Sequence, residues 1–146
     1  MNPDQERELI AVATDARTRA YVPYSHYAVG AAILTADGQL HGGCNIENAS
    51  YGLTSCAERN AIFGLVGKSA DPDARRIRAV AVVTAGTDPA TPCGACRQVI
   101  REFGKGAAII IANTDGTIFL RTTLDTLPPH SFGPEQLDSP NDNAET

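Results

Sequence analysis

Residues 79–112 read AVAVVTAGTDPATPCGACRQVIREFGKGAAIIIA and contain one complete strand-helix-strand unit. Ala79 to Ala85 is a continuous apolar run, which is typical of a strand buried on both faces of a sheet. The spacing from Cys93 to Phe103 predicts a helix, and Ala107 to Ala112 is a second apolar strand. Because a helix joins the two strands, we expect a parallel pair connected by a crossover.

A helix and a hairpin are expected at the N-terminal side of this unit. Apolar residues at helical spacing, with acidic residues early, predict an amphipathic helix over residues 3–20, which Pro23 ends. Residues 27–35 and 39–44 have strand-like patterns and flank Asp37, which begins a tight-turn signal. These two segments are therefore expected to pair as antiparallel strands.

The remaining segments complete an α/β pattern. Residues 56–68 have helical spacing, and Asp115 begins a turn signal that leads into a short strand over residues 117–121. The order of elements predicts a three-layer α/β/α fold, with a mixed sheet of about five strands flanked by helices. We expect residues 1–137 to form a single domain and residues 138–146 to be a polar, disordered tail.

The composition is that of one soluble globular domain. The 146 residues are 42% hydrophobic and include no apolar run near the roughly 18 residues that span a bilayer. The formal net charge of −5 lacks the positive excess that binding a nucleic-acid backbone requires. The polar N-terminus lacks the apolar core of a secretory signal, so we expect a cytoplasmic protein without nucleic-acid or membrane partners. The one basic cluster, Arg75, Arg76 and Arg78, is interpreted as a solvated loop end.

Cys93 and Cys96 form a C-x-x-C pair at the start of the second predicted helix. Thr91 could cap that helix and Pro92 could occupy its first position, which would place both sulfurs on one face. Such a pair suits a metal, but it also serves redox exchange and forms half of many structural zinc sites. The pair alone therefore leaves three kinds of site open.

A third cysteine, at the start of the other predicted helix, favours a catalytic metal. Cys56 and Glu58 stand in the sequence Ser55-Cys56-Ala57-Glu58. Three thiolates are one ligand short of a closed structural zinc site, which leaves a position for water. Cys44 ends a predicted strand and is interpreted as a small half-buried residue. Glu58 has an alternative role, because the Ser55-x-x-Glu58 spacing also matches a helix capping box.

The combination C-A-E followed by P-C-x-x-C is the cysteine form of the zinc nucleoside deaminase signature. In these motifs the chain resembles the small, homotetrameric, three-cysteine cytidine deaminases of the cytidine and deoxycytidylate deaminase superfamily. Similarity extends from Tyr21 to Leu137 through segments 21–25, 29–32, 43–48, 56–59 and 92–98, and through Leu127-Pro128 with Phe132.

The resemblance implies a role for each matching residue. Cys56, Cys93 and Cys96 would bind one Zn²⁺ per protomer, and Arg59 would offset the negative charge of the sulfurs. Within the chain's own site, the residues expected to contact the nucleoside are Tyr27 in the pocket lining, the Ala57 amide on the pyrimidine, and Asn45 and Glu47 on the ribose. Tyr51 and Phe132 are expected to reach into a neighbouring protomer's site, near the ribose and against the base respectively. Most similar enzymes have Phe where this chain has Tyr27.

The resemblance also implies the reaction. Cytidine, and deoxycytidine, would be hydrolysed to uridine or deoxyuridine and ammonia in pyrimidine salvage, with Glu58 carrying protons from the zinc-bound water to N3 and to the leaving amine. Three alternatives remain open: a deaminase of another aminopyrimidine nucleoside such as blasticidin S, a structural zinc module, and a thioredoxin-like redox protein.

Overall fold

The computed structural model describes residues 1–127 and 134–137. In chain order its elements are α1 (Pro3–Arg17), β1 (Gly30–Thr35), β2 (Leu40–Cys44), η1 (Tyr51–Leu53), α2 (Ala57–Lys68), α3 (Pro72–Arg75), β3 (Ile77–Thr84), α4 (Gly94–Phe103), β4 (Ala108–Asn113), β5 (Ile118–Thr123), η2 (Leu124–Thr126) and α5 (Pro134–Leu137). No helix of the described part is both long and apolar enough to cross a membrane.

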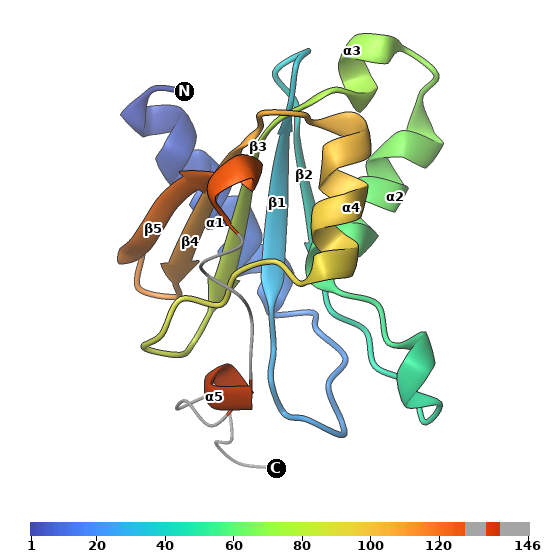
Figure 1. Cartoon of the computed structure of the whole chain (residues 1–146), viewed down its shortest axis with the longest axis vertical. Helices are drawn as coiled ribbons and strands as arrows, with labels where there is room; N and C mark the ends of the chain where they lie inside the picture. The colour runs from blue at the N-terminus through green and yellow to red at the C-terminus, as the bar shows by residue number, and fades with distance from the viewer. Residues whose placement is uncertain (128–133, 138–146) are drawn as a thin grey trace.

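Five strands form one mixed sheet in the order β2-β1-β3-β4-β5. Strands β3 and β4 are parallel, and each of the other neighbouring pairs is antiparallel. The parallel pair is joined through α4, as the strand-helix-strand pattern predicts. Helix α1 covers one face of the sheet, whereas α2 and α4 cover the other (Figure 1). The predicted three-layer α/β/α architecture is confirmed.

Alternate residues of β3 face the two halves of the core. Val80 and Val82 pack with side chains of α2 and α4, whereas Ala81 and Val83 pack toward α1. All four are at most 2% exposed. This burial on both faces explains why the strand has a continuous apolar run rather than an alternating one.

Several boundaries differ from the sequence-based expectation. Helix α1 ends at Arg17 rather than near residue 20, because Thr18 already occupies its C-cap, so Pro23 does not end it. Strand β1 begins at Gly30 and not at Tyr27. The segment between them contacts the loop after β2 through an isolated bridge from Tyr21 to Ile46.

Glycine allows α2 to lie directly on β2. A Cβ atom at Gly43 would be 2.5 Å from the Ala61 amide nitrogen and 2.7 Å from the Ala57 carbonyl oxygen. Both neighbours are helix backbone and cannot rotate away, so a side chain at Gly43 would push the helix off the strand. This contact fixes the beginning of α2, and with it Cys56, relative to the sheet.

Candidate metal centre and adjoining pocket

Two helices begin at the same end of the sheet, and a cysteine stands at each beginning. Cys56 is the N-cap residue of α2, and Cys93 is the N-cap residue of α4. Two sequence-based expectations are therefore wrong. Thr91 does not cap α4 and Pro92 is not its first residue, because the helix starts two residues later.

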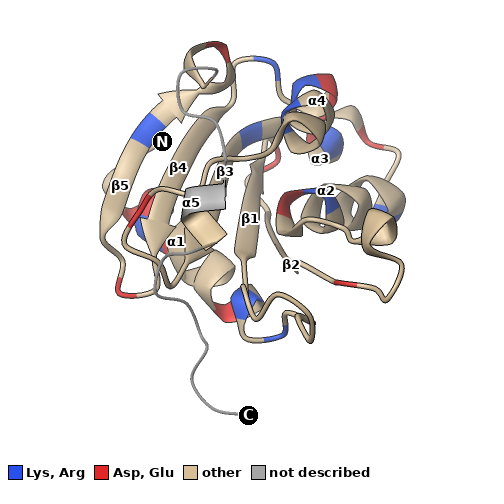
Figure 2. Ribbon diagram, turned by 60° about the horizontal axis from the view of Figure 1, so that its bottom comes forward, with Lys and Arg blue, Asp and Glu red and all other residues tan. Residues whose placement is uncertain are grey.

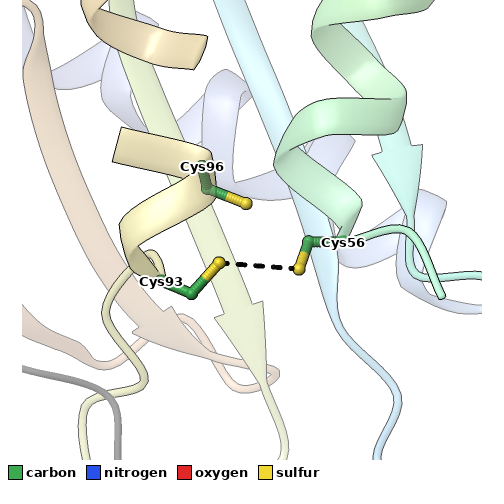
Figure 3. A group of neighbouring side chains, drawn as sticks. All are labelled: Cys56, Cys93 and Cys96. Atoms are coloured by element: carbon green, nitrogen blue, oxygen red, sulfur yellow. Dashed lines mark hydrogen bonds between the residues drawn. The ribbon is translucent and has the colours of Figure 1, made fainter. Parts of the chain in front are cut away.

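The three predicted ligands form a compact cluster (Figure 3). The sulfurs of Cys56, Cys93 and Cys96 all lie within 4.8 Å of one another. The Cys56 and Cys93 sulfurs are 3.8 Å apart. A tetrahedral site with the usual zinc–sulfur bond of about 2.3 Å places its sulfurs about 3.8 Å apart. The cluster therefore has the spacing of a zinc site.

The donor set leaves one tetrahedral position free. Among residues 1–127 and 134–137, no fourth cysteine, histidine or carboxylate belongs to the cluster. Cys44 is outside it, half-buried, and burial raises the pKa of its thiol. Three protein ligands with an open position are the arrangement of a catalytic zinc site rather than a structural one.

Hydrogen bonds among the three thiols shift their pKa values in opposite directions. Hydrogen bonds from Cys56 and Cys96 lower the pKa of Cys93, and the nearby amides of Cys96 and Ala95 lower it further. The same hydrogen bonds raise the pKa values of Cys56 and Cys96. A dication would stabilise all three thiolates together, so binding it releases protons.

Arg59 lies against the cluster, as the resemblance implies. One of its terminal nitrogens is 3.3 Å from the Cys56 sulfur, and this hydrogen bond raises the pKa of the guanidinium. Its Nε is buried and has no partner among the residues that the structure describes. A permanent positive charge here reduces the excess negative charge of three thiolates around one dication.

Glu58 is buried beside the cluster in the first turn of α2. It is only 5% exposed, and burial raises its pKa to about 7, with the negative charge of Cys93 acting in the same direction. The capping-box alternative does not hold, because Cys56 and not Ser55 is the N-cap residue. A carboxyl group with a pKa near neutrality can both accept and donate a proton at physiological pH.

A pocket of about 190 Å³ opens onto the cluster and Glu58. Five residues that the resemblance singled out line it: Tyr27, Asn45, Glu47, Ala57 and Glu58. Cys56 and Cys93 also face it, so the metal cluster forms part of its wall. Sequence reasoning missed Thr91 and Leu137 as lining residues. Leu137 belongs to a four-residue helix that has no strong sequence signal.

Two predicted contacts are not in this pocket wall. Tyr51 is 72% exposed and is not among the lining residues, and its ring packs edge-on against Tyr24 with centroids 5.4 Å apart. Phe132 lies outside the described residues. For both residues, a role in a neighbouring protomer's site stays a prediction.

Asn45 supports the chain around the pocket. Its side chain donates to the Tyr27 carbonyl oxygen at 2.8 Å and accepts from the Val29 amide at 2.9 Å. A primary amide has a second N–H and a second oxygen lone pair, so Asn45 retains capacity for a ligand. The residue is thus both part of the framework and a possible ligand contact.

Glu47 holds the same segment from its other side. Its Oε1 accepts from the amides of Tyr24 and Ser25 at 3.0 and 3.1 Å, and its Oε2 accepts from the Ser25 hydroxyl. Burial raises the pKa of Glu47, but these hydrogen bonds outweigh burial and leave it below its usual range. The residue is therefore a carboxylate acceptor at the pocket wall.

The family of the chain follows from comparison with known proteins. Residues 3–112 match the family described as "Cytidine and deoxycytidylate deaminase zinc-binding region". The chain belongs to this family. The match covers the three cysteines and Glu58, so the family and the observed sulfur cluster agree on zinc as the metal.

The chain is also similar to individual proteins over most of its length. The chain is 47% identical to a cytidine deaminase of Sporosarcina psychrophila over 131 residues, covering 89% of this chain and 93% of the relative. A solved cytidine deaminase of Burkholderia pseudomallei is 42% identical, with a TM-score of 0.75, over 90% of this chain and 100% of that one. A solved cytidine deaminase of Mycobacterium tuberculosis is 40% identical, with a TM-score of 0.70, over 87% and 96%.

Proposed function

We propose that this protein hydrolyses cytidine, and also deoxycytidine, to the corresponding uracil nucleoside and ammonia. The observation that carries the proposal is a buried glutamate, Glu58, that lines a pocket together with members of a three-cysteine cluster. Relatives with more than 40% identity over most of the chain carry the name cytidine deaminase. We further infer a role in pyrimidine salvage in the cytoplasm.

Cys56, Cys93 and Cys96 would hold the zinc ion, which supplies a Lewis acid that acidifies a water molecule. Glu58 accepts the proton of the water that attacks C4 and delivers it to N3 of the pyrimidine. The same carboxyl group then takes the proton of the new C4 hydroxyl and passes it to the departing amino group, so ammonia leaves and the carbonyl of uracil forms. The raised pKa of Glu58, about 7, suits a group that must both accept and donate.

The pocket residues orient the substrate. Asn45 and Glu47 have the remaining donor and acceptors to bind ribose hydroxyls, and both are already fixed by the segment they support. Tyr27 is 5% exposed and lines the pocket, so its ring can pack against the base. Ala57 lines the pocket between Cys56 and Glu58 in the chain, so we infer that its backbone amide contacts the pyrimidine.

The direct test is to incubate the zinc-loaded protein with cytidine, deoxycytidine and blasticidin S and to follow the ultraviolet change together with ammonia release. Both nucleosides should react, and blasticidin S should be converted far more slowly. Preferential turnover of blasticidin S would reject the proposed substrate. Zinc binding without any turnover would indicate a purely structural zinc module. A reversible Cys93–Cys96 disulfide would indicate redox chemistry.

We also propose that residues 1–137 form one catalytic domain that works as a homotetramer with shared active sites, to which Tyr51 and Phe132 contribute across an interface. Exposed apolar side chains support an interface beside the pocket: Tyr21, Tyr24, Ile46, Tyr51 and Leu53. Residues 138–146, which lie outside the described residues, are inferred to be a polar tail that is not part of this domain.

Mixed oligomers test the shared site. A Glu58→Gln chain is inactive in its own site but still supplies Phe132, whereas a Phe132→Ala chain supplies Glu58. Co-expressed chains should regain a kcat/KM per competent Glu58 close to the wild-type value, relative to Phe132→Ala alone. Absence of any gain, in oligomers confirmed to be mixed, would place Phe132 in its own chain's site or outside any site.

A further inference from the structure

A second hollow lies at the opposite end of the sheet from the sulfur cluster. It is formed where α3, the beginning of β3 and the turn after α4 meet, and its volume is about 600 Å³. The eight residues of β3 separate it from the metal end by about 26 Å at the usual rise per residue. We call it the basic hollow, because Arg75, Arg76, Arg78 and Lys105 are among the residues that line it.

The charge of the basic hollow is opposite to that of the chain as a whole. Four cations and a single acid, Glu102, line it, whereas the whole chain carries a formal net charge of −5. Figure 2 shows Lys and Arg gathered around α3, the beginning of β3 and α4. A concentration of one sign in a concave surface focuses the field and attracts ions of the opposite sign.

Three of the four cations form no ion pair within the residues that the structure describes. Arg76 pairs with Asp73 at 3.1 Å, and Arg75 uses its Nε to donate to the Val66 carbonyl oxygen. Arg78 and Lys105 have no ion pair within residues 1–127 and 134–137. The hollow therefore presents cations that the described part of the protein does not neutralise.

A β-bulge aims Arg78 into the hollow. Leu34 pairs with Ala79 but Thr35 pairs with Ile77, so Arg78 is an extra residue in β3. Its neighbours Ile77 and Ala79 are 3% and 1% exposed, whereas Arg78 is exposed. Bulges re-aim a side chain at the cost of a regular ladder, and proteins retain them as specific features.

Two glycines bring Lys105 to the same place. A Cβ atom at Gly104 would be 2.7 Å from the Ile77 Cβ, so only glycine allows the end of α4 to approach the beginning of β3 this closely. Gly106 has a φ of +79°, which completes a turn that most side chains disfavour. The turn that contains these glycines places Lys105 in the lining of the basic hollow together with the arginines.

We propose that the basic hollow binds a small molecule that carries two or more phosphate groups, such as a nucleoside polyphosphate. Guanidinium and ammonium groups are the donors that proteins use for phosphate, and several converging cations favour a multiply charged anion over a single carboxylate. The basic hollow shares no lining residue with the pocket at the metal cluster, so this ligand is not the substrate of that pocket. The inference does not depend on the proposed reaction.

The test uses the zinc-loaded full-length protein and inorganic tripolyphosphate, uridine triphosphate and a single-stranded DNA oligonucleotide as probes in titration calorimetry. Tripolyphosphate should bind saturably with one site per chain, and Arg78→Gln combined with Lys105→Gln should weaken it by about tenfold or more, because two charge-assisted contacts are lost. A matched pair, Arg7→Gln with Arg101→Gln, removes the same charge outside the hollow and should change the affinity less than about twofold. Tighter binding of uridine triphosphate than tripolyphosphate would identify a nucleotide as the source of the phosphates.

Three results would overturn the proposal. They are no saturable binding of either phosphate probe, equal weakening by both variant pairs, or preferential binding of the oligonucleotide. If the cations serve only to stabilise the end of α4, the hollow variant would lose thermal stability without any phosphate binding in the wild type. The charge-preserving swap Arg78→Lys with Lys105→Arg keeps the test valid if the neutral variant folds poorly, since the swap should retain most of the binding. Zinc content and cytidine turnover should be unchanged in every variant.

Discussion

The two ends of α4 carry opposite charges in very different surroundings. At its beginning, Cys93 and Cys96 form an anionic cluster beside the buried Glu58. Just after its end, Lys105 lines the basic hollow together with the arginines. A helix has a partial positive charge at its beginning and a partial negative charge at its end. The same backbone therefore favours thiolates at one end and cations at the other.

The metal end and the basic hollow differ in burial, and this difference predicts how each responds to substitution. Glu58 and Cys96 are 5% and 0% exposed, so their charges act through a weakly screened medium. Arg78 and Lys105 are exposed, so salt and water screen their charges. Substitutions at the metal end should have large effects on zinc and activity, whereas substitutions at the basic hollow should leave both unchanged.

The largest expected effect is loss of the metal. Cys56→Ala, Cys93→Ala or Cys96→Ala should each reduce zinc far below one per chain and abolish turnover, because two thiolates cannot replace three. Cys44→Ala is the matched control, since this half-buried cysteine is outside the cluster. Elemental analysis of the purified variants measures the effect. Zinc loss in Cys44→Ala alone would refute the ligand assignment.

Replacing Glu58 should abolish most activity but keep the metal. Glu58→Gln preserves the shape of the side chain but removes its ability to carry a proton, so kcat should fall by about 10²–10⁴ or more. Zinc content and melting temperature should remain close to those of the wild type. Steady-state kinetics on zinc-matched samples measure the effect. Near-normal turnover would mean that another group transfers the protons.

A third prediction concerns the stability of the zinc-free protein. The pKa of Glu58 is raised to about 7, so the folded state binds its proton more tightly than the unfolded state does. This contribution is fully present below pH 4.5 and is lost as the pH rises through 7, by about 3 kcal/mol in all. Urea titrations from pH 4 to 8 should show this decline in the wild type but not in Glu58→Gln. Parallel curves for the two proteins would contradict the raised pKa.

The smallest effect contrasts the two ends of α2. Gly43→Ala should destabilise the fold by about 1–3 kcal/mol, because its Cβ atom would meet the backbone at the beginning of the helix. Gly67→Ala, at the other end, meets nothing within 4 Å and should stabilise the helix by up to about 1 kcal/mol. Thermal unfolding of the two variants compares them. Equal shifts would show that α2 does not depend on its contact with β2.

The sequence was sufficient for the features that depend on repeated patterns. The apolar run of β3 and the helical spacing of α4 predicted the central crossover, and the cysteine spacing predicted the metal cluster. Features that depend on three-dimensional contact were missed. Leu137 lines the pocket from a four-residue helix, and the bulge at Arg78 depends on the register between two distant strands. No local pattern encodes either feature.

Helix capping shows where local reasoning failed. Ser55 and Thr91 are favourable cap residues by type, yet Cys56 and Cys93 occupy the cap positions. With both helices beginning at these cysteines, the three sulfurs lie within 4.8 Å of one another. The requirement for the cluster therefore overrides the preference for a hydroxyl oxygen at a helix beginning.

The cysteines at these two positions also bear on which part of the folded protein unfolds locally first. A sulfur atom stands at each cap position in place of a hydroxyl oxygen, so the first amides of α2 and α4 depend on the cluster for their order. Once the ion is removed, both first turns should fray together while the central strands stay closed, as a single unit of local unfolding. Amide hydrogen exchange should then accelerate at residues 57–60 and 94–97 but not in β3. A bound metal would therefore slow the local opening of two helix ends whose cysteines are 37 residues apart in the chain.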